Sequence, residues 1–174
     1  GLLGLGTVGG GTFNVLRRNA EEIARRAGRG IEISYAAARA YDPERLPGIE
    51  SVRVTDDAFA VVEDPDIDIV VELIGGYEPA RELVLKAIAN GKHVVTANKA
   101  LLAAHGNALF AAAARKKVDL AFEASVGGCM PIIKTMRESL VGNRISTMTG
   151  ILNGTCNYIL SKITEEWNAF PAAL

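Results

Sequence analysis

The stretch GLGTVG, residues 4–9, constrains the fold of this chain more than any other. Gly4, Gly6 and Gly9 have the spacing G-x-G-x-x-G, between an apolar segment typical of a strand and residues 12–27, which have helical periodicity. In a strand-turn-helix unit the first glycine permits a tight turn, the second lets the backbone approach a pyrophosphate, and the third lets helix and strand pack closely. The helix N-terminus offers N–H groups to the phosphates. The stretch therefore predicts a dinucleotide-binding loop, and the alternative is a glycine-rich turn without a ligand.

The segments that follow alternate between strand and helix patterns. The run IDIVVELI, residues 67–74, is almost continuously apolar, which is typical of a strand buried on both faces. Further patterns predict strands over 31–38, 52–55, 93–96 and 118–123, and helices over 58–63, 79–90 and 101–116. This βαβ alternation predicts an α/β fold, a Rossmann-type doubly wound parallel sheet with helices on both faces.

The pattern changes at Gly127. Patterns beyond it predict a helix over 132–141, a strand over 144–152, and a helix over 156–166 after an Asn-Gly turn. We expect two domains: residues 1–128 as the NAD(P)-binding Rossmann domain, and residues 129–174 as the beginning of a substrate-binding and dimerisation domain. The second α/β domain is expected to be truncated, and the chain to be a fragment that starts inside its first strand.

Composition excludes several classes of partner. The net charge of −1 leaves no basic surface of the kind that nucleic acid or an acidic membrane attracts. No apolar run approaches the roughly 20 residues that span a bilayer, and the N-terminus lacks the basic segment of a signal peptide. The two cysteines have no C-x-x-C spacing and are expected to be reduced thiols. We therefore expect a cytoplasmic protein without nucleic-acid or membrane partners.

The choice between NAD and NADP depends on the end of the second predicted strand, AAARAYDPER. An acid at this position binds the ribose 2′-OH of NAD, whereas an arginine accommodates the 2′-phosphate of NADP. Arg39 comes first and Asp42 follows three residues later, which favours NADP. A solvated arginine at a strand end is the alternative, so either cofactor remains open.

The stretch GKHVVTANKALL places Asn98 and Lys99 at the carboxyl end of a predicted strand, the edge where open α/β sheets bind ligands. An ammonium there can stabilise developing negative charge or position a hydroxyl. A lysine acts as a base only where its surroundings lower its pKa well below about 10.4. The alternative is a solvent lysine, although a cation near a helix N-terminus is mildly unfavourable. The two histidines have no triad partners, so hydrolase chemistry finds no support.

Five stretches together resemble the homoserine dehydrogenase family: GLLGLGTVGGG, ELIGG, GKHVVTANKALL, FEASVGGCMPII and GILNGTCNYIL. The resemblance runs from Gly1 to about Glu166. It implies reversible, NAD- or NADP-dependent oxidation of L-homoserine to L-aspartate 4-semialdehyde in threonine and methionine biosynthesis, by an enzyme that is a homodimer when intact.

The resemblance also implies functional residues. Lys99 matches the family's catalytic lysine near cofactor and substrate. With Arg39 and Asn98 from the reasoning above, the expected cofactor-binding residues are Gly4, Gly6, Thr7, Val8, Gly9, Arg39, Asn98 and Lys99. Asn153, Gly154 and Thr155 are expected to line the substrate cleft, and a plain turn with a capping threonine is the alternative. A sodium or potassium ion is expected on the backbone carbonyls of Glu123, Val126, Gly128 and Met130.

The chain departs from the family at its end. The family's substrate glutamate, in a GY-x-E-x-DP segment, and its second, acid-base lysine, in D-x-x-x-K, are not in this sequence. We therefore expect the chain by itself to bind cofactor with little or no turnover. The alternatives are another NAD(P)-dependent dehydrogenase of the same architecture, or a cofactor-binding module without turnover.

Overall fold

The structure is a computed structural model, and it describes residues 1–151 and 153–165. The chain forms two compact units, residues 1–139 and 140–174. The first unit extends to Ser139, and the functional division predicted after residue 128 stays a prediction. Leu152, the predicted end of a strand, and residue 166, the predicted end of a helix, lie outside the described residues.

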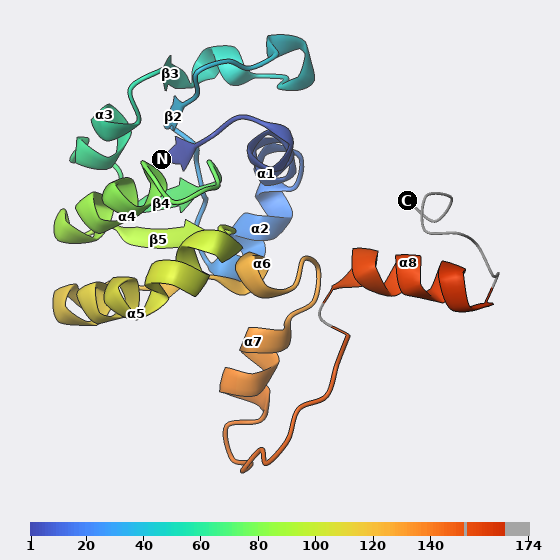
Figure 1. Cartoon of the computed structure of the whole chain (residues 1–174). Helices are drawn as coiled ribbons and strands as arrows, with labels where there is room; N and C mark the ends of the chain where they lie inside the picture. Colours follow the sequence, from blue (N-terminus) through green and yellow to red (C-terminus); the bar gives the residue numbers. More distant parts are fainter. Residues whose placement is uncertain (152, 166–174) are drawn as a thin grey trace. The chain divides into compact units, whose positions relative to one another are not determined.

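Six parallel strands form the sheet of the first unit (Figure 1). They are β1 (Leu2–Leu3), β2 (Tyr35–Ala37), β3 (Arg53–Thr55), β4 (Ile69–Glu72), β5 (His93–Thr96) and β6 (Leu120–Ala121). Their order is β3-β2-β1-β4-β5-β6, which is the order of a doubly wound dinucleotide-binding fold. The predicted fold class is therefore confirmed. The chain reverses its direction of progress between β1 and β4, and ligands of such sheets bind at this switch point.

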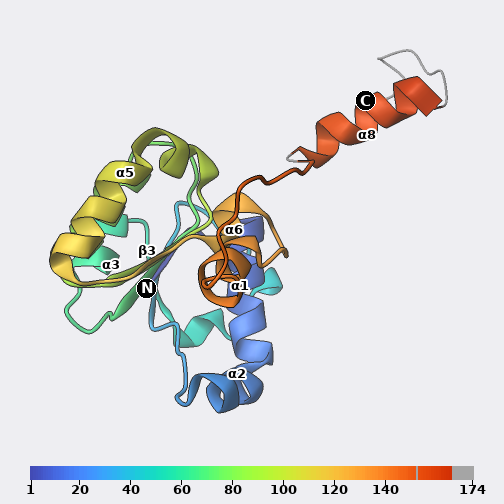
Figure 2. The same cartoon turned by 90° about the horizontal axis from the view of Figure 1, so that it is seen from below.

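Helices cover both faces of the sheet (Figures 1 and 2). The first unit contains α1 (Thr7–Arg18), α2 (Ala20–Ala27), α3 (Ala58–Glu63), α4 (Ala80–Ala89), α5 (Lys99–Lys116), α6 (Glu123–Val126), α7 (Ile132–Lys134), and the shorter turns η1 (Pro43–Arg45), η2 (Ile49–Ser51) and η3 (Thr135–Ser139). Helices α3, α4 and α5 pack side by side on one face, and α1 lies on the other. No helix among the described residues is long and apolar enough to cross a membrane.

The core has two layers because successive side chains of a strand point to opposite faces. Leu3 belongs to the layer under α3, α4 and α5, with Leu83 and Leu101, whereas Leu2 belongs to the layer under α1, with Phe13. All five are at most 1% exposed. Burying one such side chain contributes about 1.5–3 kcal/mol, so these layers hold the carboxyl ends of the strands in place.

Several local predictions were wrong in detail. The strands predicted over 31–38 and 118–123 are shorter, and the helix predicted over 132–141 is α7 followed by η3, which ends at Ser139. Residues 12–27 do not form one helix: α1 starts earlier, at Thr7, and Asn19 separates it from α2. Asparagine favours helix ends because its side chain competes for backbone hydrogen bonds. Strand β4 is buried at Val70 and Glu72, but Ile69 is 41% exposed. Its side chain points to the α1 face, which the first unit covers only in part.

In the second unit, the predicted strand over 144–152 was wrong for its described residues, because 144–151 carry no regular structure. A strand needs a partner to pair with, and the described residues of this unit include no other strand. The predicted helix over 156–166 is found as α8, Gly154–Glu165 (red in Figure 1).

Helix α5 ends with a lysine in a conformation that suits glycine. Lys117 has φ 58°, and its N–H donates to Ala114 O at 3.2 Å while the Val118 N–H donates to Ala113 O at 3.1 Å. These two bonds form a Schellman motif, which usually has glycine at this position. A left-handed residue with a Cβ costs about 1–2 kcal/mol, more than the extra chain entropy that glycine loses. Lys117→Gly is therefore expected to raise the free energy of unfolding by about 0.5–1 kcal/mol in urea titrations. Lys116→Gly, at the last residue of α5, where φ is not positive, is the control and is expected to lower it.

Candidate functional site

The glycine loop joins β1 to α1 at the switch point, and two of its glycines are required by close contacts. Gly4 has φ 98°, and a Cβ there would lie 2.9 Å from the carbonyl oxygen of Leu73. A Cβ on Gly9 would lie 1.8 Å from the carbonyl oxygen of Gly4. The first glycine therefore makes the turn and the third lets α1 pack on it, in the roles expected from the spacing.

The second glycine leaves the start of α1 open. A Cβ on Gly6 would have no atom within 4 Å, and the first turn of α1 contains no acidic residue. The first bond of the helix runs from Gly10 N to Gly6 O at 2.7 Å. The N–H groups of Thr7, Val8 and Gly9 precede it, so they have no acceptor within the helix. Open space, free donors and the positive end of the helix dipole suit a pyrophosphate.

The two candidates for recognising the ribose differ in their surroundings. The Asp42 carboxylate accepts a hydrogen bond from Glu44 N at 3.1 Å and lies 4.0 Å from Arg45 Nε, so it caps η1. Arg39 follows β2, is exposed, and has no hydrogen bond or ion pair with any residue in 1–151 or 153–165. Its guanidinium is therefore available for a ligand at this strand end, whereas the Asp42 carboxylate already accepts a bond within η1.

Asn98 and Lys99 lie at the carboxyl end of β5. Asn98 is buried; its Oδ1 accepts from Leu101 N at 3.0 Å, which caps α5, and its Nδ2 donates to Gly76 O at 2.7 Å. Lys99 is the first residue of α5 and is exposed, and no described residue pairs with its ammonium. The asparagine is thus a structural anchor that places the lysine at the ligand-binding edge.

A buried polar cluster at the same edge was not assigned from the sequence. Glu72, Thr96 and Ser125 are at most 7% exposed. The Thr96 hydroxyl donates to Glu72 Oε2 at 2.6 Å, and the Ser125 hydroxyl donates to Thr96 O at 2.7 Å. The one signal in the sequence was an acid, Glu72, near the carboxyl end of the apolar run IDIVVELI.

The predicted cation ligands lie between β6 and α7. The Glu123 carboxylate accepts from Ile133 N at 2.8 Å and Lys134 N at 2.9 Å, so it caps α7. The carbonyls of Glu123 and Met130 already accept bonds from Gly127 N and from Ile132 N. The ion on these carbonyls, with those of Val126 and Gly128, stays a prediction. No cluster of three or more histidine, cysteine or acidic side chains that suits a metal occurs in the described part.

In the second unit, the Asn-Gly-Thr step begins a helix. Asn153 Oδ1 accepts from Cys156 N at 2.8 Å, and its carbonyl accepts from Asn157 N at 3.1 Å. The cap of α8 is therefore Asn153, whereas the alternative interpretation of this turn assumed a capping Thr155. The predicted position of Asn153, Gly154 and Thr155 in a substrate cleft stays a prediction.

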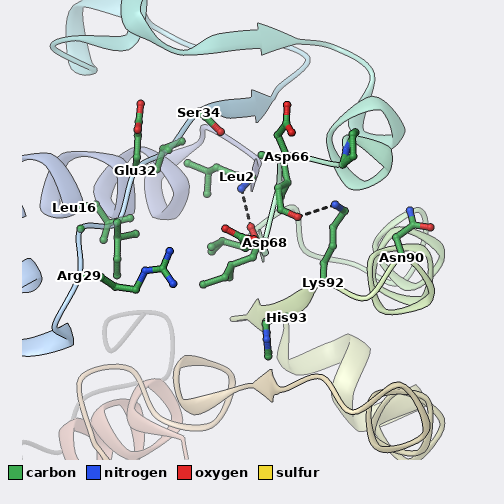
Figure 3. A pocket seen from close by; sticks show the side chains of 18 of the residues that line it. Leu2, Leu16, Arg29, Glu32, Ser34, Asp66, Asp68, Asn90, Lys92 and His93 are labelled. Atoms are coloured by element: carbon green, nitrogen blue, oxygen red, sulfur yellow. Dashed lines mark hydrogen bonds between the residues drawn. The ribbon is translucent and has the colours of Figure 1, made fainter.

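A cavity of about 940 Å³ lies at the opposite edge, at the amino ends of the strands (Figure 3). Lys92, in its wall, is 4% exposed and donates to the carbonyls of Asp64 at 2.5 Å and Ile67 at 2.7 Å. The pKa of Asp64 lies below its ordinary value because Asp66 N–H donates to its carboxylate and the Arg53 guanidinium pairs with it. These groups satisfy one another, so they serve the fold rather than the ligand edge.

Two family models match the chain. The model described as "Homoserine dehydrogenase, NAD binding domain" matches residues 4–123, and the model described as "Homoserine dehydrogenase" matches residues 131–174.

Relatives and solved structures agree with this match. The homoserine dehydrogenase of Pseudomonas aeruginosa is 61% identical over the whole chain, and that of Methylobacillus glycogenes is 54% identical. The chain spans 40% and 42% of these proteins, respectively. The crystal structure of a homoserine dehydrogenase from Thiobacillus denitrificans has a TM-score of 0.92 and 61% identity, over 99% of this chain and 40% of that one.

Proposed function

The chain belongs to the homoserine dehydrogenase family, and we propose that it is the cofactor-binding part, with the start of the substrate part, of an enzyme that reversibly oxidises L-homoserine to L-aspartate 4-semialdehyde. The observation that carries the proposal is the glycine loop at the switch point, where Gly4 and Gly9 meet contacts that a Cβ would not fit and Gly6 leaves the helix N-terminus open. The chain spans only about two fifths of the length of its relatives. The identity of the substrate therefore rests on family membership.

The oxidation removes a hydride from the carbon that bears the hydroxyl and a proton from its oxygen. NADP or NAD supplies the hydride acceptor when bound. In this proposal the N–H groups at the start of α1 bind the pyrophosphate. Lys99 meets the substrate oxygen, where its ammonium stabilises negative charge as the proton leaves. The acid-base group that accepts the proton lies outside these residues, so turnover by this chain alone is expected to be little or none.

We expect NADP to bind more tightly than NAD because Arg39 is the available charged group at the end of β2. A hydrogen bond to a charged group contributes about 1.5–3 kcal/mol. Arg39→Ala is therefore expected to raise the Kd for NADP roughly 10- to 100-fold and to leave the Kd for NAD within about twofold. Calorimetric titration of the chain with each dinucleotide measures both constants.

Arg45→Ala is the matched control for this experiment. Arg45 also follows β2 and is exposed, but it lies in η1 beside Asp42, so its loss is expected to leave both constants unchanged. Equal weakening of NADP and NAD by Arg39→Ala would show that Arg39 does not bind the 2′-phosphate. Absence of binding to either dinucleotide by the unchanged chain would contradict the proposed function.

The finer expectations extend the same proposal. The role in threonine and methionine biosynthesis, the homodimer, the sodium or potassium ion and the cytoplasmic location all follow from the family resemblance or from composition. They stay predictions for the whole protein.

A further inference from the structure

We propose that Glu72 is a positioning residue. Its buried carboxylate fixes the loop after β4 relative to the start of α5, and this relative position lets both segments contact the nicotinamide half of the dinucleotide. The identity of the ligand rests on the proposed function. The register itself rests on hydrogen bonds between described residues.

Every partner of the Glu72 carboxylate is a donor. Oε1 accepts from Ile74 N at 2.9 Å and Gly75 N at 3.2 Å, and Oε2 accepts from the Thr96 hydroxyl at 2.6 Å. Glu72 is 0% exposed, and no lysine, arginine or histidine of the described chain forms an ion pair with it. A buried carboxylate is costly unless donors satisfy it, and here three donors satisfy this carboxylate, which in turn holds them together.

The first arm of this arrangement is the loop that follows β4. Gly75 and Gly76 have φ 80° and 74°, so this backbone follows neither a strand nor a right-handed helix. The loop is also in contact with the glycine loop: a Cβ on Gly4 would lie 2.9 Å from Leu73 O and 3.5 Å from Ile74 N. Glu72 therefore fixes the N–H groups of Ile74 and Gly75 in the loop after β4.

The second arm leads to Lys99. The Thr96 hydroxyl, which donates to Glu72, also accepts from Asn98 N at 3.0 Å. The Asn98 side chain in turn donates to Gly76 O at 2.7 Å, back in the loop after β4. The bonds therefore close a ring through Glu72, Thr96, Asn98 and the loop. Lys99 follows Asn98 directly, so the ring connects the loop after β4 to the lysine.

Glutamine at position 72 tests the ring because it keeps the size of glutamate but replaces one acceptor with a donor. Its amide group must face either the two N–H groups or the Thr96 hydroxyl, and an unpaired buried donor then costs a hydrogen bond. We expect Glu72→Gln to weaken NADP binding about tenfold or more. Binding of 2′,5′-ADP, which lacks the nicotinamide half, is expected to stay within about threefold.

Val94→Ala is the control for a loss of stability alone. Val94 lies on the same face of β5 as Thr96 and is 1% exposed, but it takes no part in the ring. We expect it to lower the melting temperature and to change the Kd for both ligands equally little. If Glu72→Gln weakens NADP and 2′,5′-ADP by the same factor, the carboxylate supports only the fold and the proposal is overturned.

A second pair of variants keeps the test valid if Glu72→Gln does not fold. Thr96→Val removes the hydroxyl at nearly constant volume and is expected to weaken NADP about three- to tenfold. Thr96→Ser restores the hydroxyl and is expected to restore binding. If the Thr96→Val and Thr96→Ser proteins bind NADP equally well, the ring does not position the cofactor edge.

Amide hydrogen exchange separates this inference from the proposed function, because it needs no ligand. We expect Glu72→Gln to increase the exchange rates of the Ile74 and Gly75 amides at least tenfold, while amides of β2 such as Ala36 keep theirs. Unchanged rates at Ile74 and Gly75 would overturn the inference even if NADP binds. If NADP does not bind to the unchanged chain, the proposed function fails, and the exchange rates still decide whether Glu72 holds the loop.

Discussion

Gly9→Ala is expected to destabilise the first unit by about 3–5 kcal/mol, a large part of the roughly 5–15 kcal/mol that stabilises a domain of this kind. The added Cβ would lie 1.8 Å from the carbonyl oxygen of Gly4. That oxygen belongs to the backbone of the turn, and Gly4 is itself held by a bond from its N–H to Ala37 O at 2.8 Å. The backbone at Gly4 and the backbone at Gly9 cannot separate without moving α1 away from the sheet. Urea unfolding followed by circular dichroism measures the loss, and calorimetry is expected to show no binding of NADP.

Gly11→Ala is the matched control on the same helix. A Cβ on Gly11 would meet no atom within 4 Å, and the residue lies in the interior of α1. Because glycine is about 1 kcal/mol less favourable than alanine in a helix, this variant is expected to be more stable and to bind NADP normally. Equal urea midpoints for Gly9→Ala and the unchanged chain would contradict the close packing of α1 on the turn.

Lys99→Gln is expected to lower kcat for homoserine about 10²- to 10³-fold in the full-length protein that carries this segment, with little change in stability. A donor that meets developing negative charge typically contributes this much to catalysis. The side chain is exposed and has no partner among the described residues, so its removal breaks no contact of the fold. Loss of a cation from a helix N-terminus is mildly stabilising.

The control for Lys99 lies at the other end of the same helix. Lys116→Gln removes an equal charge from the last turn of α5, far along the helix from the ligand-binding edge, and is expected to leave kcat unchanged. Steady-state rates of NADP reduction at saturating homoserine measure both variants. A kcat for Lys99→Gln within fivefold of the unchanged enzyme would show that Lys99 is not the group that meets the substrate oxygen.

Local sequence patterns were sufficient to predict most helices and strands of the first unit. Helix α3 and strand β5 have the predicted bounds, residues 58–63 and 93–96. The glycines at positions 4, 6 and 9 have distinct environments that match their spacing. These features follow from periodicity and from backbone sterics, which act over a few residues.

The features that the patterns missed depend on partners that are distant in the sequence. The predicted strand over 144–152 has an apolar pattern, but a strand exists only when it pairs, and the described residues of the second unit offer no partner. Helix α1 begins at Thr7, in a glycine-rich stretch with low helix propensity, because packing on Gly4 outweighs propensity.

The sequence by itself determined the βαβ order, the position of the glycine turn and the family, because local periodicity and short motifs specify them. Tertiary structure alone decided that Glu72 joins Thr96, 24 residues away, and that Asn98 reaches back to Gly76, 22 residues away. The residue types of Glu72 and Asn98 do not indicate their hydrogen-bond partners, because the fold brings those partners from distant parts of the sequence. These hydrogen bonds therefore form only when the parallel strands align their carboxyl ends.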